Sequence, residues 1–112
     1  MTNNNSMPSL SADAIQAASL KLSQARSALF VAGNIAIQAT SHLKSTEARL
    51  TANGLEGKNV AERNANLVAA TAQERSNQES AEEGRRAAQH ACDLAEIEYN
   101  CIKLQLRLLE AM

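Results

Sequence analysis

The residues with the most reactive side chains in this sequence are Cys92, Cys101, His42 and His90. Nine residues apart on one helix, the cysteines would lie about 13.5 Å apart along its axis and on nearly opposite sides. A disulfide bridges Cα atoms no more than about 7 Å apart, so a bridge within the chain is excluded if that helix is continuous. Both cysteines lie on apolar stripes, and we interpret them as small buried side chains with free thiols; a bridge between chains or a reactive thiol is the alternative. Free thiols are typical of the cytoplasm, where we expect the protein.

Metal binding and catalysis would need more residues than these. His90 and Asp93 could share a helix face, but two ligands are fewer than the three or four that zinc takes from a protein. The sequence contains no glycine-rich phosphate loop, nucleophile elbow or metal-binding helix motif. It also offers no cluster of nucleophile, base and orienting group. We therefore predict no metal, no cofactor and no enzymatic activity.

Charge and composition exclude further classes of partner. Eleven basic and twelve acidic residues give a net charge of −1, and two aromatic rings offer little for stacking on bases, so we do not expect nucleic-acid binding. No run of about eighteen apolar residues could span a membrane. The chain has 22 alanines against four glycines and one proline, a composition that favours long helices over strands.

Proline and glycine divide the chain into segments. Residues 1–10 are polar, include Pro8 and predict a flexible lead-in. Residues 11–112 predict one domain, with a helix over 12–53, a turn over 54–58 and a helix over 60–111. Asn59 and Glu62 have the spacing of a capping box at the start of the second helix.

A five-residue link forces two such long helices to lie antiparallel. The prediction is therefore an all-α fold, an antiparallel two-helix hairpin with long helices like those of a coiled coil. Counting outward from the turn places residue 50 opposite 62 and residue 29 opposite 83. A break of the first helix at Gly33 and Asn34, which would give three helices, is the alternative.

A heptad pattern runs along the first helix, and large residues at one position with alanine at the other allow close helix approach. Its members are Ile15, Leu22, Leu29, Ala36, Leu43 and Leu50, with Ala18, Ala25, Ala32 and Ala39 between them. The matching stripe of the second helix consists of Ala88, Cys92, Ala95, Tyr99, Ile102, Leu106 and Leu109.

Large apolar residues outside these stripes predict an interface with another chain. They are Phe30, Val31, Ile35 and Ile37 on the first helix and Leu94, Ile97, Cys101, Leu104 and Leu108 on the second. A lone hairpin would leave them in water, which monomers rarely do. We expect a homo-oligomer, a dimer or larger, that forms a helical bundle; an obligate protein partner is the alternative.

The region of the turn carries the most specific local pattern. Gly57, Lys58 and Asn59 are followed by Glu62 and Arg63. The long helix ends in Leu104, Leu106, Leu108 and Leu109. Over about half of its length the chain thus resembles small helical-hairpin proteins encoded by bacteriophages and prophages.

This resemblance implies a phage-type accessory protein, of a kind often found among early or recombination genes. Together with the stripes, it predicts a non-enzymatic protein that acts by protein binding and self-association. One alternative is a structural or chaperone-like coiled-coil adaptor. The other is a weak single-strand DNA binder in phage recombination.

Overall fold

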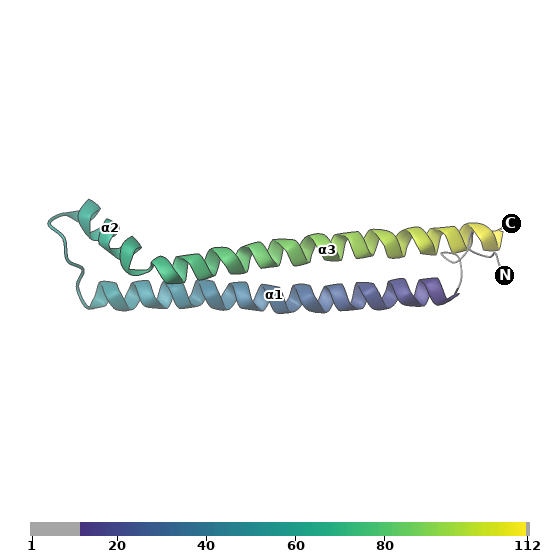
Figure 1. The fold of residues 1–112 in the computed structure, drawn as a ribbon, viewed down its shortest axis with the longest axis horizontal. Helices are drawn as coiled ribbons and strands as arrows, with labels where there is room; N and C mark the ends of the chain where they lie inside the picture. The colour runs from purple at the N-terminus through teal and green to yellow at the C-terminus, as the bar shows by residue number, and fades with distance from the viewer. Residues whose placement is uncertain (1–11, 112) are drawn as a thin grey trace. The chain divides into compact units, whose positions relative to one another are not determined.

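The computed structural model describes residues 12–111, which form three helices (Figure 1). These are α1 (Ala12–Ala52), α2 (Val60–Ala70) and α3 (Ala72–Ala111). No strand occurs in residues 12–111, so the all-α class is confirmed for this part of the chain. The predicted lead-in over residues 1–10 lies outside the described residues.

The described chain divides into two compact units, to each of which α1 and α3 contribute a segment. The first unit combines the part of α1 up to Phe30 with the part of α3 from Ala87 onward. The second unit is Val31–Arg86 and contains the rest of α1, the turn, α2 and the start of α3.

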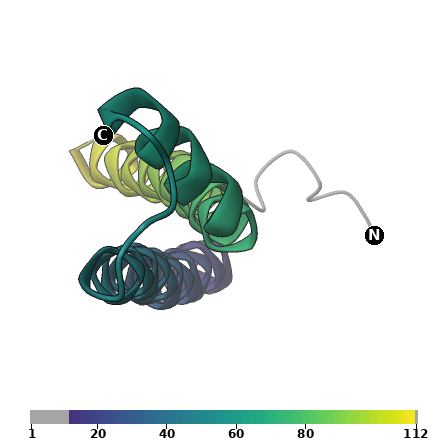
Figure 2. The same ribbon diagram turned by 90° about the vertical axis from the view of Figure 1, so that its left-hand side faces the viewer.

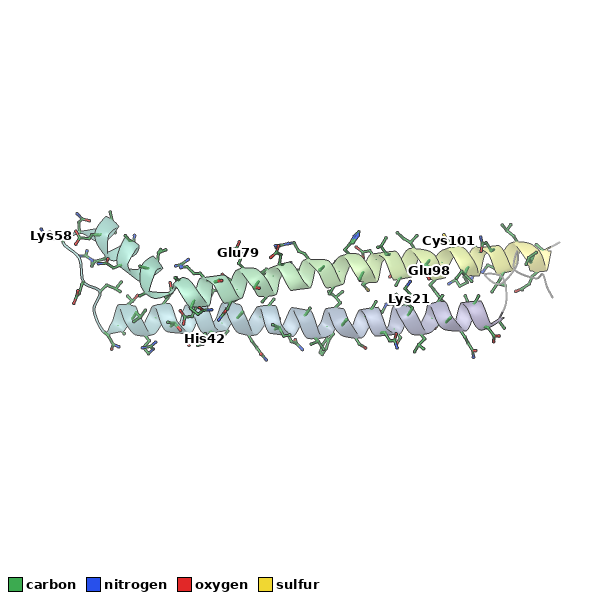
Figure 3. All side chains as sticks on the ribbon, viewed as in Figure 1. Lys21, His42, Lys58, Glu79, Glu98 and Cys101 are labelled. Carbon is green, nitrogen blue, oxygen red and sulfur yellow. The ribbon has the colours of Figure 1, made fainter. Side chains whose placement is uncertain are left out.

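The first unit holds a small apolar core. Leu22 of α1 and Cys92 and Ala95 of α3 are buried together, and Ala25, Leu29 and Tyr99 pack against them. Outside this core, Lys21 Nζ lies 3.1 Å from Glu98 Oε1 (Figure 3). Arg26 Nη2 lies 3.3 Å from Glu96 Oε2. Because the numbers rise on α1 while they fall on α3, the two segments run antiparallel.

The second unit joins α1 and α3 through polar contacts. Gln78 Nε2 donates to Thr40 Oγ1 at 3.0 Å, and Arg75 Nη2 donates to Glu47 Oε2 at 2.6 Å. The pairing is again antiparallel. Polar residues between paired helices specify register at some expense of stability.

The heptad prediction for α1 is confirmed. All of its predicted members are buried or half-buried, and Thr46 continues the same spacing as a buried residue. The alternative break at Gly33 and Asn34 is wrong, since α1 is continuous from Ala12 to Ala52. One glycine in a helix costs only about 1 kcal/mol, which packing of the buried stripe can outweigh.

The prediction of a single helix over 60–111 is wrong, because the helix is interrupted at Thr71. This residue has φ −109° and ψ 19°, outside the helical range, and ends α2. Its hydroxyl donates to the Leu67 carbonyl at 2.8 Å, a bond of the kind that bends helices. Figure 2 shows α2 on the α3 side of the second unit, apart from α1.

The interruption also shifts the pairing of α1 with α3. The predicted register places Thr40 opposite Ala72, whereas Thr40 contacts Gln78, six residues further along. The predicted register counts α2 as part of one long paired helix, whereas α2 ends at Thr71 and has no buried residue.

Candidate interaction surfaces

An apolar stripe of α3 lies exposed in the first unit, and we call it the outer stripe. It consists of Leu94, Ile97, Cys101, Leu104 and Leu108. The four residues other than the cysteine are between 54% and 67% exposed. Because each residue turns an α-helix by about 100°, Leu94 lies on nearly the opposite side from the buried Cys92. Figure 3 shows Cys101 on the side of α3 that faces away from α1.

The two cysteines differ in environment. Cys92 is buried against α1, as predicted, but Cys101 is exposed, so the prediction of burial is wrong for Cys101 in the single chain. The separation of nine residues turns the helix by about two and a half turns and places the second thiol on the far side. Both are free thiols.

A second exposed apolar group lies on α1. Val31, Ile35 and Ile37 are exposed in the second unit, and Phe30 is exposed at the end of the first. Ile37 lines a groove of about 600 Å³ together with Gly33, Glu82 and Arg85.

Ile35 lines a smaller groove with short or polar residues of α3, among them Asn77, Ser80 and Gly84. The part of α3 beside Ile35 and Ile37 therefore has no large apolar side chain with which to cover them.

The turn motif has a structural role that explains its residues. Gly57 has φ +144°, which L side chains rarely adopt, and a Cβ there would lie 2.8 Å from the Arg63 amide nitrogen. Arg63 Nη1 donates to the Gly57 carbonyl at 3.3 Å. The Asn59 side chain accepts from the Glu62 N–H at 2.9 Å, which confirms the predicted N-cap. These contacts hold the loop against the start of α2, and Lys58 remains exposed beside them.

A buried polar cluster that was not predicted from the sequence lies at the junction of α2 and α3. Thr71 is fully buried, and its hydroxyl accepts from Arg75 Nε at 2.9 Å while the same guanidinium binds Glu47. The sequence signal was the spacing of four residues between Thr71 and Arg75. No apolar periodicity accompanies this spacing, so the hydropathy pattern does not indicate the polar cluster.

In the described part of the chain, the histidines do not belong to a group of side chains that could hold a metal ion. His42 Nε2 lies 4.0 Å from Glu74 Oε2 in the second unit. Within residues 12–111, no group of three or more histidine, cysteine, aspartate or glutamate side chains could hold a metal ion.

None of the described helices has the length and apolar character needed to cross a membrane.

Comparison with protein-family models, with curated proteins and with solved structures gave no match.

Proposed function

We propose that this chain is a non-enzymatic, cytoplasmic accessory protein of the phage type that works by binding proteins and by self-association. In this proposal the whole chain is an antiparallel helical hairpin whose exposed apolar faces bring hairpins together into a bundle. The contact surfaces are the outer stripe of α3 and the exposed apolar residues of α1.

The balance between buried and exposed apolar side chains carries this proposal. Among the described residues, the buried apolar side chains are four small ones and two leucines. Twelve large apolar side chains are exposed, including Phe30 and most of the outer stripe. Monomeric proteins rarely leave contiguous apolar surface in water, and burial of one such side chain contributes about 1.5–3 kcal/mol.

The phage-type part of the proposal rests on the resemblance in the turn. There the Arg63 side chain donates to the Gly57 carbonyl, and the Asn59 side chain caps α2 by accepting from the Glu62 N–H. A motif with this structural purpose would serve any hairpin of the same design. The exposed faces of the helices would then determine which proteins each such hairpin binds.

Light scattering after gel filtration tests self-association. At micromolar concentration the expected mass is at least twice the 12.0 kDa of the chain. Capture from the native host followed by mass spectrometry then separates self-assembly from binding of another protein. A monomer that captures no protein would contradict the proposal.

A pair of double variants locates the contact surface. Leu104→Glu with Leu108→Glu should yield monomers, since each copy would bring unpaired charge into an apolar contact. The matched control is Val60→Glu with Val68→Glu, which makes the same chemical change at exposed positions of α2. We expect the control to retain the mass of the parent protein. Equal masses for all three proteins would show that the outer stripe is not the contact.

A further inference from the structure

We propose that the outer stripe of α3 pairs with the outer stripe of a second copy in the antiparallel direction, with Asp93 beside Arg107 of the partner subunit. This inference rests on the proposed function, because it assumes self-association. It adds the identity of the occupant, the direction of pairing and the register. Only residues of the first unit are involved.

Spacing is the first observation. The members of the outer stripe follow one another at intervals of three, four, three and four residues. This is the pattern of the two contact positions of a coiled coil, and it continues for two full heptads. The stripe is exposed throughout, while the opposite face of the same helix, with Cys92 and Ala95, is already buried against α1. The outer stripe therefore has the spacing of a second coiled-coil contact face, and this face is exposed in the single chain.

Charge gives the direction of pairing. Along the outer stripe of α3 the acidic residues Asp93, Glu96 and Glu98 come first and the basic residues Lys103 and Arg107 follow, while Glu110 lies beyond the last residue of the stripe. Two parallel copies would place like charges side by side. Two antiparallel copies place the acidic part of each helix over the basic part of the other, which favours this direction.

The contacts that these charged residues already make within the chain indicate which two of them could pair between copies. Glu96 and Glu98 are bound by Arg26 and Lys21 of α1. Lys103 Nζ lies over the Tyr99 ring, 5.4 Å from its centroid.

Asp93 accepts a hydrogen bond from Gln89 but forms no ion pair with another residue of the described range 12–111. Arg107 forms no ion pair with any residue of 12–111. Both residues flank the outer stripe on the same edge, the position from which coiled coils form salt bridges between helices.

The register follows from this pair. When Asp93 faces Arg107 of the partner subunit, Leu94 packs on the partner's Leu104 and Ile97 packs on the partner's Cys101. Each contact occurs twice because the dimer is symmetric. Leu108 closes each end against the partner's His90. A parallel pair would instead bring Asp93 toward the partner's Glu98, a repulsive contact.

Disulfide trapping between two single-cysteine proteins tests this register. The first protein carries Cys92→Ala and keeps Cys101. The second carries Cys92→Ala, Cys101→Ser and Ile97→Cys. After mixing and mild oxidation, we expect a covalent dimer only between the two different proteins, because residue 97 faces residue 101 of the other copy. Each protein alone should stay uncrosslinked, since identical residues are offset by about 6 Å along the axis in addition to the separation of the helices.

The other outcomes are equally informative. Crosslinking of each protein with itself would establish parallel pairing and overturn the inference while leaving the proposed function intact. A dimer by light scattering with no crosslink in any mixture would overturn the register. A monomer in light scattering would overturn the proposed function itself.

Charge reversal provides an independent measurement. Asp93→Arg and Arg107→Asp should each raise the dimer dissociation constant by roughly tenfold, since two repulsive contacts replace two attractive ones. The protein with both changes should recover the parent affinity. In a parallel dimer Asp93→Arg would instead bind more tightly, because it would face Glu98. Circular dichroism of each variant checks that the helices are retained.

Discussion

At the scale of the residue, Thr71 shows how one hydroxyl can both end a helix and begin the next. It donates to the Leu67 carbonyl of α2 and accepts from Arg75 of α3, so its hydrogen-bonding capacity is used although the residue is fully buried. Arg75 in turn reaches Glu47 on α1. α1, α2 and α3 are thereby joined in the second unit through a single polar cluster.

We predict that Thr71→Val, which keeps the shape and removes the hydroxyl, lowers the free energy of unfolding by about 1–3 kcal/mol. Thr71→Ser keeps the hydroxyl and should lose only about 0.8 kcal/mol, for the missing methyl group. Urea unfolding at a fixed protein concentration measures both. A valine variant as stable as the parent would mean that the hydroxyl contributes nothing to the junction.

The two glycines of the turn should differ in their tolerance of alanine. At Gly57 both the positive φ and the approach of the Arg63 backbone oppose a Cβ, and we expect Gly57→Ala to cost about 2–3 kcal/mol. Gly54 has φ +85° and open space around it, so Gly54→Ala should cost about 1–2 kcal/mol. Thermal unfolding of the two variants gives the comparison. The opposite order would show that the contact with Arg63 relaxes freely.

Local chemistry explains why some of these residues could be predicted from sequence and others could not. Asn59 was predicted because a cap needs only its own side chain and the amide three residues on. Thr71 depends on Glu47, which lies far away in the sequence, and its neighbours are good helix formers. No local rule distinguishes this threonine from one that is exposed in the middle of a helix.

At the scale of the element, periodicity predicted α1 correctly and the pairing of α1 with α3 only in part. The buried stripe of α1 runs without interruption, and its alternation of leucine and alanine is visible in the sequence. On α3 the seven-residue spacing continues from the buried Cys92 to Arg85 and Gln78 in the second unit, and then to Thr71 immediately before α3. These residues are polar, so hydropathy alone does not indicate that they are helix contacts. The register was counted outward from the turn without the interruption at Thr71, and this produced the six-residue difference.

Two leucines that are two residues apart on α1, one in the core and one on the surface, should differ in how much they contribute to the free energy of unfolding. Leu22 is 5% exposed in the core of the first unit, and Leu20 is 60% exposed. We expect Leu22→Ala to lower the free energy of unfolding by about 2–5 kcal/mol and Leu20→Ala to change it by less than about 0.5 kcal/mol. Denaturant titration checks both. A large loss from Leu20→Ala would assign Leu20 to a contact with another chain.

At the scale of the whole molecule, α3 carries apolar side chains on two faces. Cys92 and Ala95 are covered within the chain, whereas the outer stripe is not. Apolar residues outside the contact stripes can be recognised in the sequence, and the residues of the predicted interface are exposed in the single chain. In the proposed assembly a second molecule covers them, and the pattern of one chain restricts the identity of that molecule only through spacing and charge.

The proposed self-association through these faces leads to a final prediction about thermal stability. Because the core of a single chain is small, folding and association should be coupled, and the melting temperature should rise with protein concentration. Each tenfold increase in concentration then adds about 1.4 kcal/mol per dimer, which circular dichroism can follow between about 1 and 100 μM. For the variant with Leu104→Glu and Leu108→Glu the melting temperature should be lower and independent of concentration, because a monomer unfolds without dissociating. If the parent protein also melts at one temperature over this range, its stability comes from the single chain, and the exposed faces of α1 and α3 do not contribute to its folding.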